Sequence, residues 1–293
     1  MIISNENRFI FFKPMKTAGS SIEVFLSQHC GEDDILTGSD HEDEILSSSF
    51  RYPKRNNIQE ILLDGQEAID HLTKSGNSHL INSSLEENKV SILYPRFHMH
   101  STPVQFKNNS ELEPIFKDYY TFTIIRNPWD TMISFFWWSF YHPPTIHVDE
   151  YGNVVFTEDP GNFSLTNRPH IAPLEDDSIE TLKRKFQSFI STYADFQGPY
   201  GLDKGENILE WFFKINSEFY SIDDLDFVIR YENLQEDFNT VCEKIKISPG
   251  TLPRLKTTQR KAKINYRHYY NSQTREMIES LFASWTKKFN YSF

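Results

Sequence analysis

The feature that most constrains this chain is a run of four apolar residues that ends in a short loop containing one lysine. Residues 9–21 read Phe-Ile-Phe-Phe-Lys-Pro-Met-Lys-Thr-Ala-Gly-Ser-Ser. Four apolar residues without alternation are typical of a strand buried on both faces, and Pro14 then ends the strand's hydrogen bonding. Ser20 or Ser21 is suited to cap a helix that follows. The segment therefore predicts a strand, a tight loop and the start of a helix.

This predicted loop has the properties of a phosphate site. A loop that leads into a helix directs backbone N–H groups and the positive end of the helix dipole at one place, and Lys16 would add a full charge there. The pattern of nucleoside-triphosphate sites, with two glycines before Lys-Ser/Thr, is absent because Lys16 precedes the glycine. An ordinary strand-to-helix turn with a solvated lysine is the alternative, and both interpretations are open at this point.

Length and composition place limits on the class of protein. The chain has 293 residues, enough for one α/β domain with a large core. A mean hydropathy of −0.54 argues against a membrane protein. Met1 lies only eight residues before the first predicted strand, so we expect no signal peptide or membrane anchor and a cytoplasmic location. Cys30 and Cys242 form no Cys-x-x-Cys pair, which predicts two free thiols and no cysteine metal site.

Charge is distributed unevenly along the chain. The net charge of −11 disfavours a nucleic-acid-binding protein. Residues 17–50 contain no Lys or Arg, whereas residues 252–275 contain no Asp or Glu. The basic residues of the second stretch are Arg254, Lys256, Arg260, Lys261, Lys263, Arg267 and Arg275. A basic stretch in an acidic protein is a candidate anion site, and a solvated face is the alternative.

The pattern of apolar residues predicts most of the remaining elements. Strands are expected over 90–94 and 119–125, where β-branched and aromatic residues are dense. Helices are expected over 58–72, over 103–116 after a cap at Ser101 or Thr102, over 179–193 and over 277–289.

Two histidines follow the strand expected over 90–94. His98 and His100 would share one face of an extended chain. A histidine at the end of a strand is a candidate general base, because its pKa lies near neutrality. A two-histidine zinc site is an alternative, although no third ligand lies nearby in the sequence, and a purely structural pair is another.

The strand expected over 119–125 ends in a second candidate anion site. Arg126 opens the sequence Arg-Asn-Pro-Trp-Asp, and a helix is expected from about Asp130. Ser134 would lie one turn into this helix, beside Arg126 at the strand tip. An arginine and a hydroxyl at a helix N-terminus form a phosphate clamp.

Together these motifs resemble the sulfotransferases that use 3′-phosphoadenosine 5′-phosphosulfate (PAPS), in the branch that contains carbohydrate O-sulfotransferases. Pro-x-Lys-Thr-Ala-Gly-Ser-Ser resembles the family's 5′-phosphosulfate loop, and Arg-Asn-Pro followed by Ser134 resembles its 3′-phosphate motif. The His-Ser-Thr-Pro stretch lies where this branch carries its catalytic base. Ala18 and Ser20 stand where relatives often carry Gly and Thr.

The resemblance also implies an architecture. Residues 224–240 resemble the family's late strand and following helix, and residues 264–293 resemble its C-terminal segment. The implied fold is α/β and P-loop-NTPase-like, with three layers in which helices flank a central, mainly parallel sheet. It would form a single domain over 1–293 with insertions at 31–88 and 142–175, which match no part of the family's pattern.

The activity implied by the resemblance is in-line transfer of a sulfuryl group from PAPS to an acceptor hydroxyl without a metal. The branch implies a carbohydrate as the acceptor, and a lipid headgroup, a small alcohol or a tyrosine peptide are the alternatives. Lys16 would stabilise the leaving phosphate, His100 would be the general base, and His98 would orient His100 or contact the acceptor. The implied donor-binding residues are Lys16, Thr17, Ala18, Gly19, Ser20, Ser21, Arg126, Ser134, Arg260, Lys261 and Lys263.

Other functions fit parts of the sequence. A P-loop kinase would bind ATP with magnesium, and a non-catalytic nucleotide- or carbohydrate-binding protein would keep the same core pattern. The aromatic run over 134–142 is expected to be mostly core, with a saccharide-stacking role as the alternative. The turn-rich stretch over 143–173 is a candidate lid or substrate loop.

Overall fold

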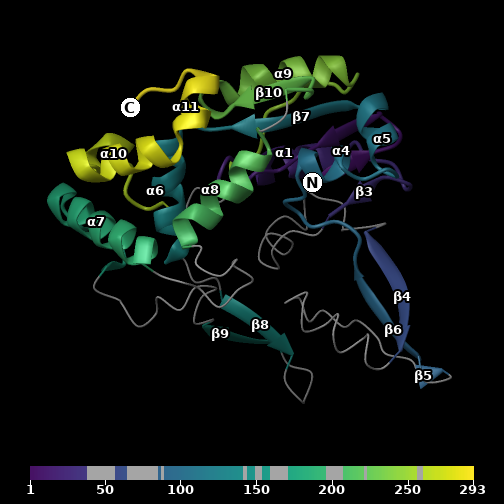
Figure 1. Cartoon of the computed structure of the whole chain (residues 1–293), viewed down its shortest axis with the longest axis horizontal. Helices are drawn as coiled ribbons and strands as arrows, with labels where there is room; N and C mark the ends of the chain where they lie inside the picture. The colour runs from purple at the N-terminus through teal and green to yellow at the C-terminus, as the bar shows by residue number, and fades with distance from the viewer. Residues whose placement is uncertain are drawn as a thin grey trace.

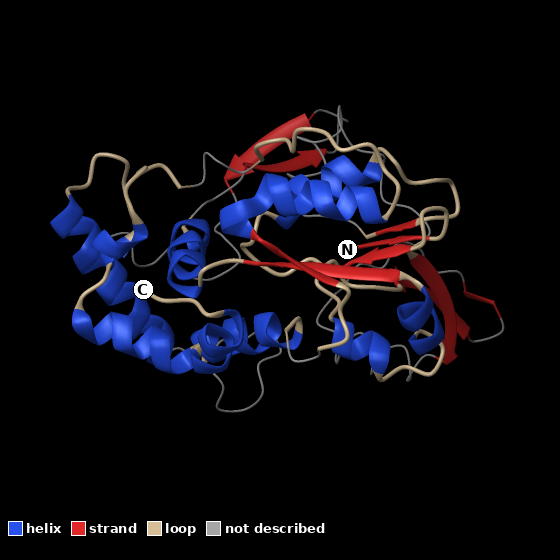
Figure 2. Cartoon of the chain, turned by 90° about the horizontal axis from the view of Figure 1, so that it is seen from above, coloured by secondary structure: helices blue, strands red, loops and turns tan. Residues whose placement is uncertain are grey.

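The chain is an α/β protein with a mixed five-stranded sheet and helices on both faces of that sheet (Figures 1 and 2). The strand order is β10-β7-β2-β1-β3. The strands are β1 (Ile2–Ser4), β2 (Phe9–Phe11), β3 (Ile35–Leu36), β7 (Tyr120–Ile125) and β10 (Phe227–Arg230). The computed structural model describes residues 1–37, 57–64, 85–86, 89–140, 144–148, 154–158, 171–195, 207–220, 223–255 and 260–293.

The sheet is half parallel and half antiparallel, so the expectation of a mainly parallel sheet was wrong. Strand β7 runs parallel to β2 and to β10, whereas β1 runs antiparallel to β2 and to β3. The antiparallel pairing of β1 with β2 follows from the short turn over residues 5–8 that joins them, in which Arg8 has a φ of 52°. So short a connection joins only antiparallel neighbours, because a parallel pair needs a crossover of a dozen or more residues.

Each face of the sheet is covered by its own apolar core. On one face Phe9, Phe11 and Phe122 pack with buried residues of α1 (Gly19–Ser27) and α9 (Leu234–Lys244). On the other face Ile10 and Phe12 belong to a larger cluster built from the remaining helices. These helices are α4 (Pro103–Lys107), α5 (Glu113–Asp118), α6 (Pro128–Ser139), α7 (Ile179–Asp195), α8 (Ile208–Glu218), α10 (Ser272–Leu281) and α11 (Ala283–Phe289).

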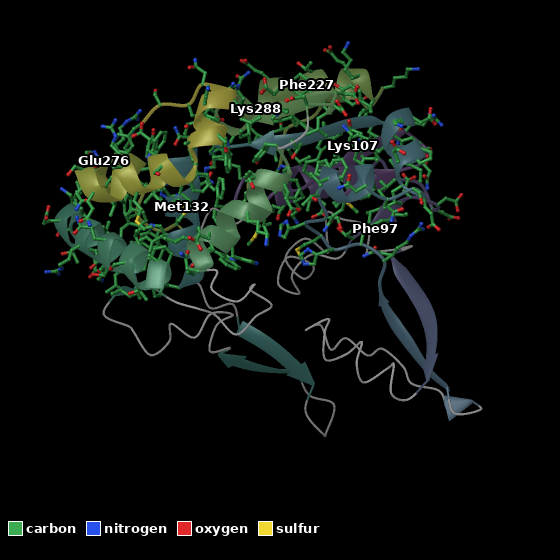
Figure 3. The ribbon with its side chains drawn as sticks, in the orientation of Figure 1. Phe97, Lys107, Met132, Phe227, Glu276 and Lys288 are labelled. Atoms are coloured by element: carbon green, nitrogen blue, oxygen red, sulfur yellow. The ribbon has the colours of Figure 1, made fainter. Side chains whose placement is uncertain are left out.

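Alternating side chains explain this division. Successive residues of a strand point to opposite faces of the sheet, so a strand of apolar residues contributes side chains to the cores on both faces. Helix α7 buries Leu182, Phe186 and Phe189, as its predicted apolar stripe requires. In Figure 3, Met132 of α6 lies among the helices, whereas the side chain of Lys107 lies at the surface.

Two smaller sheets lie apart from the five-stranded sheet (Figure 1). One pairs β4 (Ile58–Asp64) with β6 (Lys89–Pro95), which also pairs with β5 (Leu85–Glu86). The other is the hairpin of β8 (Pro144–Val148) and β9 (Val154–Glu158). The helix expected over 58–72 was therefore wrong over 58–64, and residues 65–72 lie outside the described part. A short apolar run is compatible with either a helix or a strand, and here the pairing with β6, which is distant in the sequence, makes it a strand.

Three helix boundaries also differ from expectation. The helix expected over 103–116 is divided into α4 and α5, because Pro114 is tolerated only in the first turn of a helix. Thr102 caps α4, as predicted, and forms a capping box with Gln105. Helix α1 has no serine cap; Ala18 occupies the cap position with a φ of 70°. The expected helix over 277–289 is interrupted at Phe282.

Cys30 and Cys242 are buried thiols outside any disulfide, as predicted. In the part of the chain that the structure describes, no helix is both long enough and apolar enough to cross a membrane.

Candidate functional site

The loop between β2 and α1 is the base of the site. Lys16 and Ala18 both have left-handed backbone conformations, with φ of 62° and 70°. Thr17 Oγ1 donates to the carbonyl of Pro14 at 3.1 Å, which closes the loop on itself. Asn216 of α8 accepts from the backbone N–H of Met15 at 3.1 Å. These contacts hold a tight turn that leads directly into the first turn of α1.

The N-terminus of α1 is directed into a pocket. No side chain at the cap position accepts a hydrogen bond from the first turn of this helix. The pocket is lined by every residue from Lys13 to Ser21. An α-helix leaves its first N–H groups without partners inside the helix, and its dipole favours an anion there. The geometry of this turn therefore suits a phosphate or sulfate group.

Arg126 enters the same pocket from the end of β7. Its Nε and Nη2 donate to Asp130 Oδ2 at 2.9 and 2.7 Å, and its Nη1 donates to the carbonyl of Lys16 at 3.0 Å. Its guanidinium carbon lies 4.0 Å from the ring centroid of Tyr231, in the 3-10 turn η3 (Tyr231–Asn233). Because Arg126 is only 7% exposed, these contacts hold its side chain in one place.

Arg260 reaches the same carboxylate from the basic stretch. Its Nη1 donates to Asp130 Oδ1 at 2.7 Å and its Nη2 to the carbonyl of Ile264 at 2.6 Å. Asp130 thus bridges two arginines that are far apart in the sequence. Burial alone would raise the pKa of Asp130, but the charges of Arg126 and Arg260 outweigh that effect and lower the pKa below its usual value.

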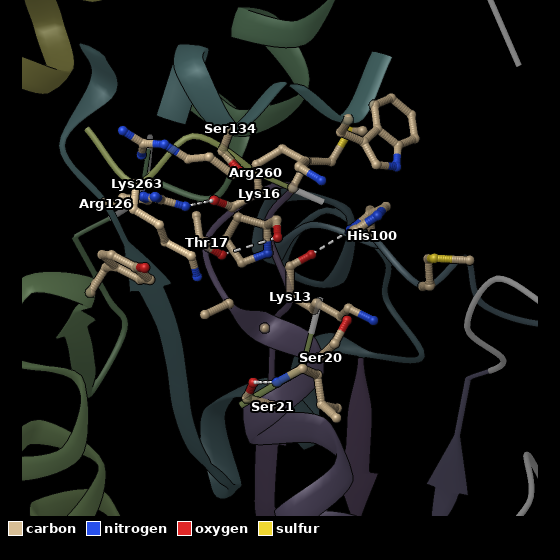
Figure 4. Close-up of a pocket in the computed structure, with 18 of the residues that line it drawn as sticks. Lys13, Lys16, Thr17, Ser20, Ser21, His100, Arg126, Ser134, Arg260 and Lys263 are labelled. Carbon is tan, nitrogen blue, oxygen red and sulfur yellow. Dashed lines mark hydrogen bonds between the residues drawn. The ribbon is translucent and has the colours of Figure 1, made fainter. Parts of the chain in front are cut away.

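His100 lies on the opposite side of the loop from Arg126 (Figure 4). Its Nδ1 lies 2.6 Å from the carbonyl oxygen of Lys13. A carbonyl only accepts hydrogen bonds, so Nδ1 carries the proton and Nε2 has the lone pair of the neutral ring. Burial, and then the nearby charge of Lys13, lower the pKa of His100 well below its usual value. A neutral imidazole with a lone pair on Nε2 is the form that accepts a proton in general-base catalysis.

The charged residues that line this pocket are cationic, although Glu23 and Asp130 pair with three of them from outside the lining. The cavity has a volume of about 430 Å³, within the range of small-molecule sites. Five of its lining residues are cationic, and among the described residues that line it none is Asp or Glu. The cationic residues are Lys13, Lys16, Arg126, Arg260 and Lys263. An anion is therefore the ligand that this lining favours, although the whole chain is acidic.

The structure brings together most of the residues that the sequence singled out. The predicted site residues that line the pocket are Lys16, Thr17, Ala18, Gly19, Ser20, Ser21, His100, Arg126, Ser134, Arg260 and Lys263. His98 and Lys261 are exposed and are not among the lining residues. His98 contacts its neighbour instead, since its Nδ1 accepts from the backbone N–H of His100 at 3.1 Å.

Eight further residues line the pocket that were not named individually as site residues from the sequence: Lys13, Pro14, Met15, Met99, Trp138, Tyr231, Leu255 and Ile264. Tyr231 directly follows β10, and the carboxyl ends of parallel strands meet at one edge of a sheet, so its position was accessible from the sequence. Trp138 is half-buried, and the ammonium of Lys16 lies 5.0 Å from the centroid of its ring. Among the described aromatic residues of the run over 134–142, Trp138 is the one that lines the pocket.

Within the described part of the chain, no group of three or more His, Cys, Asp or Glu side chains is arranged to hold a metal ion. The rings of His98 and His100 are tilted by 53° relative to each other, with their centroids 5.6 Å apart. The two-histidine zinc interpretation therefore gains no third ligand from these residues.

Comparisons of the chain with models of protein families, with curated proteins and with solved structures found no match.

Proposed function

We propose that this protein is a sulfotransferase that moves a sulfuryl group from PAPS to an acceptor hydroxyl. The observation on which the proposal depends is that one pocket contains Lys16 and the α1 N-terminus, the Arg126–Ser134 pair and a neutral His100. A donor with a phosphosulfate at one end and a phosphate at the other needs two separate anion sites. An acceptor hydroxyl needs a base, so the three parts match the three requirements.

In this proposal each end of the donor has its own set of residues. The 5′-phosphosulfate would lie at the N-terminus of α1, where Lys16 and the backbone N–H groups favour negative charge. The 3′-phosphate would bind Arg126, Ser134 and a residue of the basic stretch, for which Arg260 and Lys263 are placed in the pocket. We also propose that β2, the loop and α1 correspond to the phosphate-binding unit of a P-loop-like sulfotransferase fold.

The proposed reaction is an in-line displacement at sulfur. The acceptor oxygen forms a bond to sulfur while the bond from sulfur to the 5′-phosphate oxygen breaks, and both electrons of that bond leave with the phosphate. Lys16 would stabilise the charge that develops on the leaving oxygen. The hydroxyl proton would pass to Nε2 of His100, because Nδ1 already donates to Lys13. Bound PAPS supplies the sulfuryl group, and the protein supplies position and charge.

We propose a saccharide as the acceptor. Trp138, Met99 and His100 all line the pocket. Half-buried indole rings provide a flat apolar surface, on which the C–H face of a sugar ring packs.

Calorimetric titration with 3′-phosphoadenosine 5′-phosphate tests the donor site, with ATP and magnesium as the comparison ligand. We expect binding of the first ligand, weakened roughly 10- to 150-fold in Arg126→Ala, which corresponds to a loss of about 1.5–3 kcal/mol for charged hydrogen bonds. Arg184→Ala is the matched control, because Arg184 is exposed on α7. Binding of ATP-magnesium alone would indicate a kinase, and binding of neither ligand would contradict a nucleotide-dependent enzyme.

Turnover is tested separately with PAPS and a panel of saccharides. His100→Asn is expected to abolish sulfuryl transfer while leaving binding of the nucleotide product intact, because His100 is placed to act on the acceptor. Full activity in this variant would remove His100 as the base and leave the donor site unaffected.

A further inference from the structure

A buried ion pair lies directly beneath the loop of the proposed donor site. Lys13 Nζ is 2.6 Å from Glu23 Oε2, and the two side chains are 6% and 1% exposed. The other oxygen of Glu23 accepts from the amino group of Met1 at 3.0 Å. A buried ion pair is weak evidence for stability, because the loss of hydration offsets most of the attraction between the charges. Stability alone therefore does not account for this pair.

The surrounding backbone leaves space for the Lys13 side chain. Gly19 is the first residue of α1, and a Cβ atom at this position would lie 2.6 Å from Lys13 Cγ. This distance is shorter than real contacts of a Cβ atom, so Gly19→Ala would have to displace the lysine. The path of Lys13 from the end of β2 to Glu23 thus depends on a glycine at the start of the helix.

Lys13 acts on His100 through both its backbone and its side chain. Its carbonyl accepts from Nδ1 of His100 at 2.6 Å, which sets the tautomer and orients the ring. Its ammonium lowers the pKa of His100, second only to burial as a cause. The other charged or titratable groups that face His100 are His98 and the amino group of Met1, which donates to the carbonyl of Met99 at 3.2 Å. Both lower the pKa further, and less than the Lys13 ammonium does, whereas the hydrogen bond to the Lys13 carbonyl raises the pKa, by less than the ammonium lowers it.

We propose that Lys13 is a positioning residue for His100, with its carbonyl orienting the imidazole, its ammonium placing a positive charge nearby, and Glu23 holding the side chain in place. The proposal rests on the role of His100 as the base in the proposed function. A positive charge near the ring disfavours the imidazolium form. The ring is therefore neutral when an acceptor arrives, and the proton that it takes up is readily lost to solvent after transfer.

The test is a titration of His100 followed by NMR, which needs neither donor nor acceptor. The ring C–H signal of His100, one of ten histidines, is identified by its loss in His100→Asn. We expect the midpoint of this signal to shift upward in Lys13→Met, which keeps most of the length of the side chain and removes its charge. Lys244→Met is the matched control, because Lys244 is exposed on α9, and it should leave the midpoint unchanged.

A second variant keeps the test decisive if Lys13→Met does not fold. Lys13→Met/Glu23→Gln removes both buried charges, so no carboxylate loses its lysine partner. An upward shift is expected again, and it should be smaller than in the single variant because the negative charge of Glu23 is removed as well. An unchanged midpoint in either folded variant would overturn the proposal, even if the protein transfers sulfuryl groups. Conversely, an upward shift in a protein without sulfotransferase activity would support the Lys13–His100 contact and contradict only the proposed reaction.

Discussion

At the scale of single residues, His100 shows how the structure selects one chemical form of a side chain. A histidine in water changes its charge near pH 6.5. Here a carbonyl oxygen fixes the proton on Nδ1, and burial together with Lys13 lowers the pKa. The protein therefore presents a neutral ring at pH 7, with Nε2 as the acceptor.

This lowered pKa makes the stability of the protein depend on pH. The unfolded chain binds a proton at His100 as the pH falls through about 6.5, whereas the folded protein does so only at lower pH. The contribution of the neutral His100 to the free energy of unfolding is therefore fully present above pH 6.5. It is lost progressively as the pH falls from that value to the lower pKa of the folded state. We expect the urea midpoint to fall more between pH 7.5 and 5.5 in the wild type than in His100→Asn.

The asparagine variant is suited to this comparison because its side-chain N–H can donate to the carbonyl of Lys13, whereas the amide does not bind a proton in this pH range. All other titratable groups are the same in the two proteins, so their contributions cancel in the difference. Equal shifts of the urea midpoint in both proteins would show that His100 titrates normally in the folded state.

At the scale of elements, Asp130 connects the end of β7, the first turn of α6 and the basic stretch. Each of its oxygens accepts from a different arginine, Arg126 or Arg260. One carboxylate thereby positions two cations in an anion pocket before any ligand arrives. Groups that are already in place lose little freedom on binding, which favours affinity.

We expect Asp130→Asn to weaken nucleotide binding, although the substitution removes a negative charge from the neighbourhood of an anion. Loss of the shared carboxylate would release both arginines and cost about 1–3 kcal/mol of folding free energy. Calorimetry with 3′-phosphoadenosine 5′-phosphate and a denaturant titration measure the two effects. Tighter binding in Asp130→Asn would show instead that repulsion by the carboxylate outweighs its positioning of the arginines.

The C-terminal segment packs through aromatic contacts and a hydrogen bond against the turn from β7 into α6, at Trp129 and Asn127. Phe293 packs edge-on against Trp129, Tyr266 and Tyr270, with ring centroids 5.4–5.9 Å apart. Asn127 Nδ2 also donates to the carbonyl of Ser292 at 3.4 Å. The C-terminal segment thus packs against the turn at Asn127, from which it is remote in the sequence.

At the scale of the whole molecule, the two cysteines report on the packing of one face of the sheet. Cys30 follows α1 and Cys242 lies in α9, and both belong to the cluster that contains Phe9, Phe11 and Phe122. Burial raises the pKa of the Cys242 thiol from 9.0 to about 11. At a given pH below both values this leaves about a hundredfold less of the reactive thiolate.

We therefore expect Cys242 to react with an aromatic disulfide reagent only when this face of the protein opens. In Cys30→Ser, where Cys242 is the single thiol, labelling at pH 8 should be slow in the native protein and immediate in guanidinium chloride. The release of coloured thiolate measures both rates. Immediate labelling of the native variant would mean that α9 is not packed against the sheet as described.

Several features were predictable because they depend on short stretches of chain. The strand-loop-helix unit that begins at β2 and the strand that ends at Arg126 follow from local runs of apolar and β-branched residues. Their site residues were accessible as well, because polar residues that follow parallel strands meet at the same edge of a sheet. The cap of α4 at Thr102 is a local hydrogen-bond pattern of the same kind.

Other features were not predictable from local patterns. Strand β4 adopts its form because it pairs with β6, about 30 residues later, and its apolar spacing alone also fits a helix. The absence of a serine cap on α1 follows from the left-handed backbone of Lys16 and Ala18, which the packing of the whole loop imposes.

The sequence by itself determined which kinds of groups are present, and on which local elements: a lysine in a tight loop, an arginine at a strand tip and a histidine after a strand. Only the tertiary structure decided that the sheet is mixed, that Asp130 joins Arg126 to Arg260 and that Lys13 faces both Glu23 and His100. The physical reason is range. Periodicity and capping act over a few residues, whereas strand pairing and the distances between charges depend on how segments remote in the sequence pack together.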